Sequence, residues 1–265
     1  MSAPDLRQQA AWAAGDFSKV GVASVIVSEL LCEAVVLRAG ERVLDVATGA
    51  GNTALAAARR STDVVGVDFV PSLLERARER AHAERLHRIT FQEAPNDALP
   101  FPDHSFDVLL STFGHMFTPD PAKGLAEMLR VVRPGGRIGF AAWTPQGFTG
   151  GMFRTSVKYA PPPAGVPPPV EWGDERVVRE RFGGHAKEFR FEKRFLTFRA
   201  PTAADWLAHM REHFGPTRLL WERLDEAQRT ALTADMLELV GRFNTSGDET
   251  LLVPSEYLEA VVVLR

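Results

Sequence analysis

The stretch "RVLDVATGAGNTALAAARR", from Arg42 to Arg60, decides the fold of this chain. Its first five residues are mostly apolar, as in a buried strand, and its last eight have the composition of a helix. Between them Gly49 and Gly51 begin the spacing G-x-G-x-x-A, in which glycines let a backbone turn tightly and approach a ligand closely. The stretch therefore predicts a strand, a ligand-binding glycine loop and a helix, with one acid, Asp45, at the end of the strand.

The composition limits the classes of protein to consider. The chain has 265 residues, of which 45% are hydrophobic, and a formal net charge of −3. This balance gives no general electrostatic reason to bind nucleic acid or an anionic membrane. A single cysteine, Cys32, excludes an internal disulfide, and we find neither a signal peptide nor a membrane-spanning stretch. We expect a cytoplasmic globular protein, a monomer or a homodimer, with a small-molecule partner.

Short apolar runs alternate with helical patterns before residue 145, which predicts a parallel sheet covered by helices on both faces. The predicted strands are 42–46, 64–67, 89–93, 106–110 and 137–142, and the predicted helices are 20–37, 53–60, 72–85 and 122–132. Arg78, Arg80, Arg85 and Arg88 alternate with glutamates around the third of these helices, which indicates a solvent-exposed face.

The pattern changes after Trp143, where a proline-rich segment predicts a loop or cap without sheet structure. Beyond it we predict a helix at 174–182, a strand at 189–198 and helices at 203–214 and 225–241. The last segment, "EYLEAVVVLR", is predicted as a strand or as an interrupted helix and strand. We interpret the chain as a single domain in four parts: a helical lid (1–38), a core (39–145), a cap (146–200) and C-terminal helices with the final strands (201–265).

Asp45 bears on the choice of cofactor. Asp68 ends the second predicted strand, seventeen residues after Gly51, where its carboxylate can accept hydrogen bonds from both ribose hydroxyls of an adenosine. The loop and this acid fit both NAD and S-adenosylmethionine (SAM). A second acid beside the loop favours SAM, because SAM carries an ammonium and a sulfonium and has no pyrophosphate.

Four segments in order resemble motifs of the class I SAM-dependent methyltransferases that act on small molecules. These are "VLDVATGAGNTALAAA", "VVGVDFVPSLLERARERA", "ALPFPDHSFDVLLSTFGHMF" and "EMLRVVRPGGRIGFAAWTP". The resemblance implies an α/β fold, with a Rossmann-like, doubly wound, mostly parallel sheet of seven strands, and SAM as the cofactor. It implies that Asp45, Ala47, Gly49 and Gly51 border the methionine half of SAM. Asp45 could instead stabilise the loop by a hydrogen bond, or it could both stabilise the loop and contact SAM.

The same resemblance implies contacts with the adenosine half. Asp68 would hold the ribose and Phe69 would lie against one face of the adenine. Relatives tend to carry an aspartate where this chain has Pro95, so Asn96 or Asp97 would supply the other adenine contacts, and the choice between them stays open.

Trp12 and Phe17, in a segment similar to the family's lid, would close over SAM. Packing on the first helix is the alternative for these two rings.

The segment from Ser111 to Phe117 follows the fourth strand and is expected to face the transferring methyl group. His115 is the candidate general base, because the ordinary pKa of histidine lies near neutrality. The alternative is a histidine that shapes the pocket. We predict no metal site, since His209 and His213 have helical spacing but no third ligand nearby in sequence.

The predicted function is methyl transfer to an O or N nucleophile, or to a ring carbon, of a small aromatic or hydrophobic metabolite. Two alternatives remain at this stage: an NAD-dependent oxidoreductase and a SAM-binding protein without catalysis. The acceptor would be recognised by the lid and by apolar, aromatic and basic residues of the cap segment, namely Phe148, Met152, Phe153, Arg154, Lys158, Tyr159 and Trp172.

Overall fold

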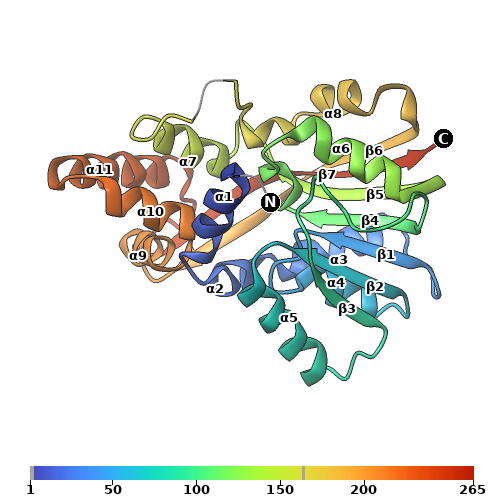
Figure 1. Ribbon diagram of the computed structural model, residues 1–265. Coiled ribbons are helices and arrows are strands. Elements are labelled where there is room, and N and C mark those ends of the chain that lie inside the picture. The colour runs from blue at the N-terminus through green and yellow to red at the C-terminus, as the bar shows by residue number, and fades with distance from the viewer. Residues whose placement is uncertain (1–2, 163–164) are drawn as a thin grey trace.

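The structure, a computed structural model, describes residues 3–162 and 165–265 (Figure 1). The strands of this described part are β1 (Arg42–Val46), β2 (Asp63–Asp68), β3 (Ile89–Glu93), β4 (Phe106–Thr112), β5 (Val132–Trp143), β6 (Ala186–Ala200) and β7 (Leu251–Leu264). They form one sheet in the order β3-β2-β1-β4-β5-β7-β6, in which β7 runs antiparallel to both of its neighbours and the other pairs are parallel. The predicted doubly wound α/β fold is confirmed.

Helices cover both faces of the sheet. On one face α3 (Val25–Ala34) and α4 (Asn52–Ala58) pack against alternate strand residues such as Val43 and Leu110. On the other face α6 (Pro121–Val131) and α8 (Glu175–Phe182) pack against the intervening residues, including Leu44 and Leu109. Burial on both faces explains why these strands are apolar throughout instead of alternating with polar residues. Helix α5 (Pro71–Ala83) connects β2 to β3.

A group of helices beside the sheet forms the cap, on the left in Figure 1. Its members are α7 (Phe148–Val157), α9 (Ala203–His213), α10 (Gly215–Arg223) and α11 (Glu226–Phe243), and they share one apolar cluster. Three of the four lie between β6 and β7, so the cap differs from the predicted segment 146–200. Residues 186–200 of that segment form the edge strand β6 instead. The N-terminal helices α1 (Ala3–Ala13) and α2 (Phe17–Gly21) lie between the cap and the sheet.

Several elements differ from the sequence prediction. Helix α10 was not predicted, and α7 was predicted as loop because it was grouped with the proline-rich segment that follows it; Gly150 and Gly151 also have low helix propensity. Close packing explains the glycines, since a Cβ at Gly150 would lie 2.4 Å from the Pro145 carbonyl oxygen and one at Gly151 would lie 2.8 Å from Leu239. The predicted helix 20–37 is interrupted by a 3-10 turn, η1 (Val22–Ser24), and other 3-10 turns are η2 (His115–Phe117), η3 (Pro169–Gly173) and η4 (Gly183–His185).

The described helices include none with the length and apolarity needed to cross a membrane.

The strand order reverses beside β1, because the chain runs from β1 outward to β3 and then returns to β4 on the other side. The loops that leave β1 and β4 meet at this point. A Cβ at Gly114 would lie only 2.4 Å from the Cβ of Ala47, so glycine is required for the two loops to approach this closely. Ligands of doubly wound sheets bind at the carboxyl ends of the strands at such a reversal. The fold therefore places the candidate site here.

Candidate cofactor and acceptor site

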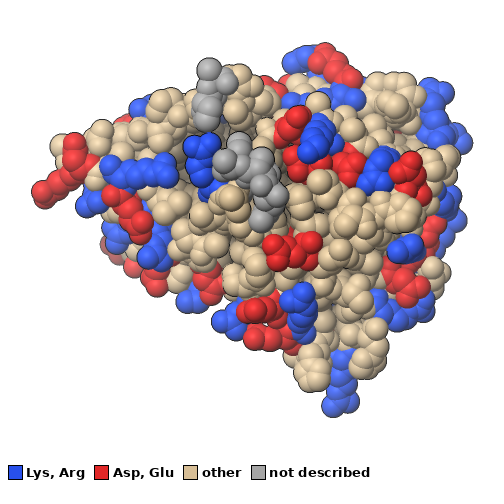
Figure 2. Space-filling model, viewed as in Figure 1, with Lys and Arg blue, Asp and Glu red and all other residues tan. Residues whose placement is uncertain are grey.

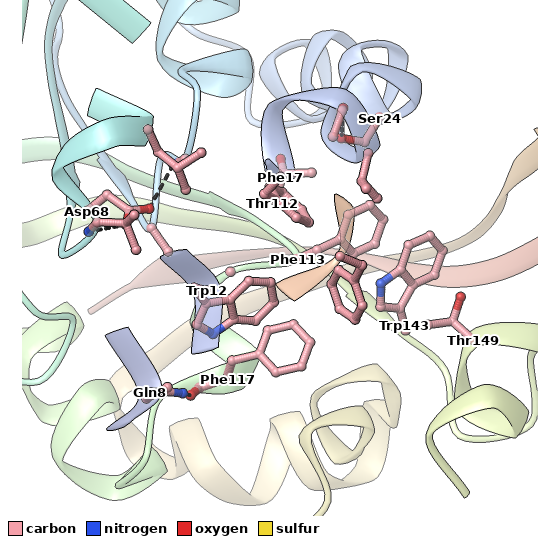
Figure 3. A pocket seen from close by; sticks show the side chains of 18 of the residues that line it. Gln8, Trp12, Phe17, Ser24, Asp68, Thr112, Phe113, Phe117, Trp143 and Thr149 are labelled. Atoms are coloured by element: carbon pink, nitrogen blue, oxygen red, sulfur yellow. Dashed lines mark hydrogen bonds between the residues drawn. The ribbon is translucent and has the colours of Figure 1, made fainter. Parts of the chain in front are cut away.

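A cavity of about 130 Å³ opens at the carboxyl ends of β1, β2 and β4 and extends under the lid helices and the cap (Figure 3). Asp68 lies at one end of it, and Trp143 and Thr149 lie at the other. The predicted site residues that line this cavity are Trp12, Phe17, Ala47, Gly49, Asp68, Phe69, Asn96 and Asp97. Asp45, Gly51, Ser111 and His115 do not line it.

Asp68 is the best-defined polar group of the cavity. Its Oδ2 accepts a hydrogen bond of 2.9 Å from the Gly49 amide, and its Oδ1 accepts one of 2.9 Å from the Val70 amide. Burial raises the pKa of Asp68 to about 6, against the lowering effect of these amides. Each carboxylate oxygen has two acceptor positions, so both can also accept from a ligand hydroxyl. The geometry fits the predicted ribose contact.

The glycine loop contains three residues with positive φ: Ala47 at 54°, Gly49 at 55° and Gly51 at 86°. Gly49 lies on the cavity, and a Cβ there would come 3.9 Å from the ring of Phe17. Gly51 lies beneath the loop, where a Cβ would be 3.0 Å from the Cβ of Ala77. The first glycine therefore faces a ligand, and the second allows α4 and α5 to pack together.

Asp45 is buried below the loop. Its Oδ2 accepts hydrogen bonds of 2.5 Å from the Thr48 hydroxyl and 2.9 Å from the Ala54 amide, so it does brace the loop. Its Oδ1 is buried without a hydrogen-bond partner in the described structure. Burial raises the pKa of this carboxyl to about 7. Because Asp45 does not line the cavity, it acts on a ligand through the loop that it braces, and SAM fits the site through Gly49 and the buried carboxylate of Asp68, which both lie on the cavity.

The candidate adenine contacts lie at the same end of the cavity. The Phe69 carbonyl accepts a hydrogen bond from Gln9 of α1, which links the lid to this end. Asn96 donates to the Thr118 hydroxyl at 3.3 Å and has a buried, unpaired Oδ1, whereas Asp97 lies 3.6 Å from the Lys123 ammonium. Both side chains reach the cavity, so the choice between them stays open.

The structure corrects the expectation that His115 faces the transferring methyl group. His115 is 2% exposed and lies between Phe140 and Trp172, with ring centroids 4.5 and 4.8 Å away. Burial, with a smaller contribution from Arg181, lowers its pKa to about 3. The ring points into the core because η2 turns the chain away from the cavity. A side chain outside the cavity cannot act as the general base there.

The Ser111 side chain also has a structural role. Its hydroxyl donates to the Val46 carbonyl at 2.8 Å and accepts from the His115 amide at 3.0 Å. These bonds join the ends of β1 and β4 below the cavity, and the side chain does not reach a ligand directly.

The acceptor end of the cavity was only partly predicted. Met152 and Phe153 line it as expected, but Phe148 and Trp172 are buried in the core, and Arg154, Lys158 and Tyr159 point elsewhere. Of the segment 111–117 that was expected to face the methyl group, Thr112, Phe113 and Phe117 line the cavity, and the prediction missed Trp143, Leu196, Phe198, Trp206, Met210 and Phe214. Three of these, on and just after α9, repeat every four residues, which is a signal for an apolar helix face but not for a pocket.

The fold and this site define a class of protein, an α/β enzyme with an adenosine-type cofactor at the end of β1. Comparison with known proteins identifies the class further. Residues 43–136 match the family model described as a methyltransferase domain.

The uncharacterized protein Rv1405c of Mycobacterium tuberculosis is 34% identical over 244 residues, which cover 90% of this chain and 89% of that protein. The demethylmenaquinone methyltransferase of Deinococcus radiodurans is 42% identical over 129 residues, 47% of this chain and 53% of that enzyme.

Solved structures show the same fold at low sequence identity. The YcgJ protein of Bacillus subtilis has a TM-score of 0.62 at 20% identity and covers 90% of this chain and 98% of its own. A phosphoethanolamine methyltransferase of Haemonchus contortus, solved with S-adenosylhomocysteine, has a TM-score of 0.54 at 17% identity over 90% of this chain and 53% of its own.

The chain belongs to the family of SAM-dependent methyltransferases. It is an enzyme of that class, and its cofactor is SAM. The oxidoreductase alternative is thereby excluded.

Proposed function

We propose that this methyltransferase acts on a small, uncharged, aromatic or hydrophobic acceptor and methylates an oxygen, a nitrogen or a ring carbon of it. The observation that carries the proposal is the wall of the cavity beyond the cofactor residues. Phe113 and Trp143 are stacked there with ring centroids 3.9 Å apart, and Trp206, Met210 and Phe214 come from the cap opposite them. Such surfaces favour apolar, planar ligands.

The charges of the cavity support an uncharged acceptor. Among the described side chains that line it, Asp68 and Asp97 are the ionisable ones, and both belong to the end assigned to adenosine. The acceptor end offers hydroxyl groups instead, those of Thr112, Thr149 and Ser24. A charged acceptor would lose its hydration there without gaining an ion pair, which is strongly unfavourable.

Thr112 is the hydroxyl best placed to orient an acceptor. Its Oγ1 accepts a hydrogen bond of 2.8 Å from Thr53, whose own hydroxyl lies 3.0 Å from that of Ser28. Because Thr112 is the acceptor in the first of these bonds, its hydrogen is free to be donated into the cavity. The chain can thereby hold an acceptor oxygen or nitrogen in one orientation.

Bound SAM supplies a methyl group on a sulfonium, which is a good leaving group. The residues of the chain then have to align the acceptor with that methyl group and keep water out, which can provide a large part of the rate enhancement. The lid helices and the cap enclose the cavity for this purpose. The similarity to demethylmenaquinone methyltransferase, an enzyme named for a quinone substrate, supports ring-carbon methylation as one variant of the proposal.

The proposal can be tested with SAM and a matched set of acceptors: a hydroquinone, a phenol, an aromatic amine and a benzoate, followed by S-adenosylhomocysteine release and product mass. We expect turnover of uncharged acceptors and none of benzoate. Trp206→Ala should raise the acceptor KM at least tenfold without changing affinity for S-adenosylhomocysteine, because it removes part of the aromatic wall. Trp221→Ala, which alters a cap tryptophan outside the cavity, is the control.

Turnover confined to carboxylates would contradict the proposal, and so would binding of SAM with no turnover of any of these acceptors.

A further inference from the structure

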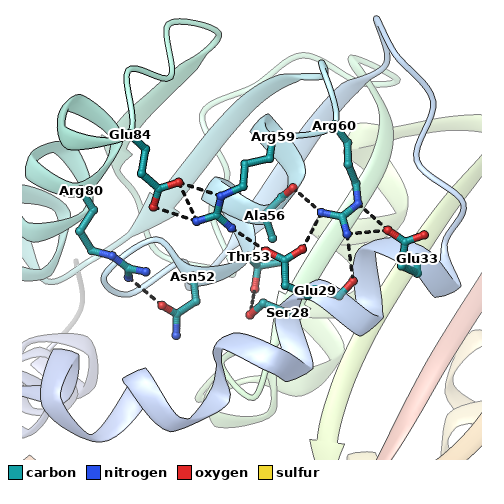
Figure 4. A network of polar contacts seen from close by, with 10 residues as sticks. All are labelled: Ser28, Glu29, Glu33, Asn52, Thr53, Ala56, Arg59, Arg60, Arg80 and Glu84. Carbon is teal, nitrogen blue, oxygen red and sulfur yellow. Dashed lines mark hydrogen bonds and ion pairs between the residues drawn. The ribbon is translucent and has the colours of Figure 1, made fainter.

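Arg80, on α5, is not part of the solvent-exposed face that its sequence context predicts. It is half-buried, and its Nη1 donates to the Ala50 carbonyl at 2.6 Å and to the Asn52 Oδ1 at 2.7 Å. Figure 4 shows its guanidinium directed at Asn52, where α4 begins. Arg78, two residues earlier, is exposed and donates to the Phe91 carbonyl instead. Arg80 is therefore the arginine of this helix that contacts the glycine loop.

The contact with Arg80 determines how the Asn52 amide is oriented. A guanidinium can only donate, so the amide oxygen must face Arg80 and the amide nitrogen must point the other way. On that side, Nδ2 donates to the Gly21 carbonyl at 2.8 Å and approaches the Ser24 hydroxyl at 3.4 Å. Gly21 is the last residue of α2. One amide thus connects α5 and the glycine loop to the lid.

The lid residues held in this way form a wall of the cofactor cavity. Gly21 and Ser24 line it, and Gly21 packs so closely on Phe17 that a Cβ there would lie 3.2 Å from the ring. Phe17 in turn lies over Gly49 and meets Trp12 edge to face at 5.5 Å. Movement of Gly21 away from Asn52 would therefore move the aromatic residues that close the cavity.

We propose that Arg80 and Asn52 are positioning residues that hold the N-terminal lid closed over the SAM site. Arg80 orients the Asn52 amide, and the amide holds the last residue of α2 by its hydrogen bond to the Gly21 carbonyl. Neither side chain lines the cavity, so both act through the lid and the loop and not by contact with SAM. The cofactor then binds to a site whose lid is already in place, and less of the binding free energy is spent on ordering it.

Asn52→Asp tests the link with little change in size. A carboxylate still accepts from Arg80 but cannot donate to the Gly21 carbonyl. We expect the Kd of S-adenosylhomocysteine, measured by calorimetry, to rise about fivefold or more, as for the loss of one hydrogen bond. Tryptic cleavage after Lys19, an exposed residue of α2, should accelerate by a similar factor, because proteolysis follows local opening.

Three measurements complete the experiment. Cleavage after Lys187, exposed on β6, separates opening of the lid from a general loss of stability, since only the Lys19 rate should change. Arg80→Met should weaken binding and speed cleavage after Lys19 as Asn52→Asp does, whereas Arg78→Met should behave as the unmodified protein. If Asn52→Asp does not fold, Arg80→Met carries the test by itself, because it removes both Nη1 contacts and leaves Asn52 in place.

Unchanged affinity and unchanged cleavage in Asn52→Asp would overturn the proposal. Weaker binding with unchanged cleavage after Lys19 would also overturn it, because the two residues would then act on the glycine loop alone.

Discussion

Replacing Asp45 with asparagine should remove the part of the pH dependence of stability that comes from this carboxyl, while the part that comes from Asp68 stays the same in both proteins. The carboxyl is buried, its Oδ2 accepts from Thr48 and Ala54, and its Oδ1 has no partner in the described structure. Asparagine keeps an oxygen for the first two contacts and places an NH₂ group at the unpaired position. It therefore resembles the protonated aspartic acid and cannot ionise.

The magnitude follows from the pKa of Asp45, which burial raises from 3.8 to about 7. The unfolded chain releases this proton near pH 4, whereas the folded chain holds it until about pH 7, so stability is lost as the pH rises through that interval. The difference between the two pKa values corresponds to about 4 kcal/mol. For a chain of this size that is a change in Tm of roughly 8–16 °C.

The assay is thermal unfolding of both proteins without cofactor, between pH 4.5 and pH 8. The unmodified protein should lose stability relative to Asp45→Asn across this range, and the variant should gain at the alkaline end. Asp45→Asn should weaken the binding of SAM more than the binding of S-adenosylhomocysteine, because only SAM carries a positively charged sulfonium. A constant difference in Tm at every pH would refute the reasoning, because it would mean that Asp45 is already ionised in the fold at pH 4.5.

Three further predictions concern single residues of the site. Gly51→Ala should lower the free energy of unfolding by about 2–4 kcal/mol, because a Cβ there adds a close contact with α5 to the strain of a positive φ. Gly40→Ala, at a φ of 83° with open space around it, should lower it by only about 1 kcal/mol. Equal losses of the two variants in urea titrations would contradict this comparison. His115→Leu should leave kcat within about twofold of the unmodified enzyme, and a tenfold loss with normal SAM affinity would restore its role as the base. Asp68→Ala should weaken binding of S-adenosylhomocysteine at least tenfold by calorimetry, while unchanged affinity would exclude the ribose contact.

Local pattern was sufficient for the core of the fold. The strands at 42–46 and 89–93 have the bounds that the sequence predicts, and the other predicted strands lie within observed ones. Most of the predicted core strands are short runs rich in apolar residues, so the information is contained within a few neighbouring positions. The helices α7 and α10 were missed because their stability comes from packing in the cap and not from their own propensities.

The site was predictable where side chains follow the strand ends directly. Gly49, Asp68 and Phe69 lie on the cavity because the carboxyl ends of adjacent parallel strands meet there. Asp45 precedes the same loop, but its carboxylate is turned away from the cavity because it accepts hydrogen bonds from the Thr48 hydroxyl and the Ala54 amide. Spacing along the chain does not contain that information.

The sequence by itself determined the order of strands and helices in the core before residue 145, the glycine loop and, through the companion motifs, SAM as the methyl donor. Only the tertiary structure decided that His115 points into the core, that the acceptor wall combines β5, α9 and the loop after β4, and that Arg80 reaches Asn52. These outcomes depend on contacts between segments that are distant in the chain, such as Asn52 with Gly21 and Trp143 with Phe113. Such contacts arise only when the sheet brings those segments together, because no local pattern specifies which side chains will share a cavity.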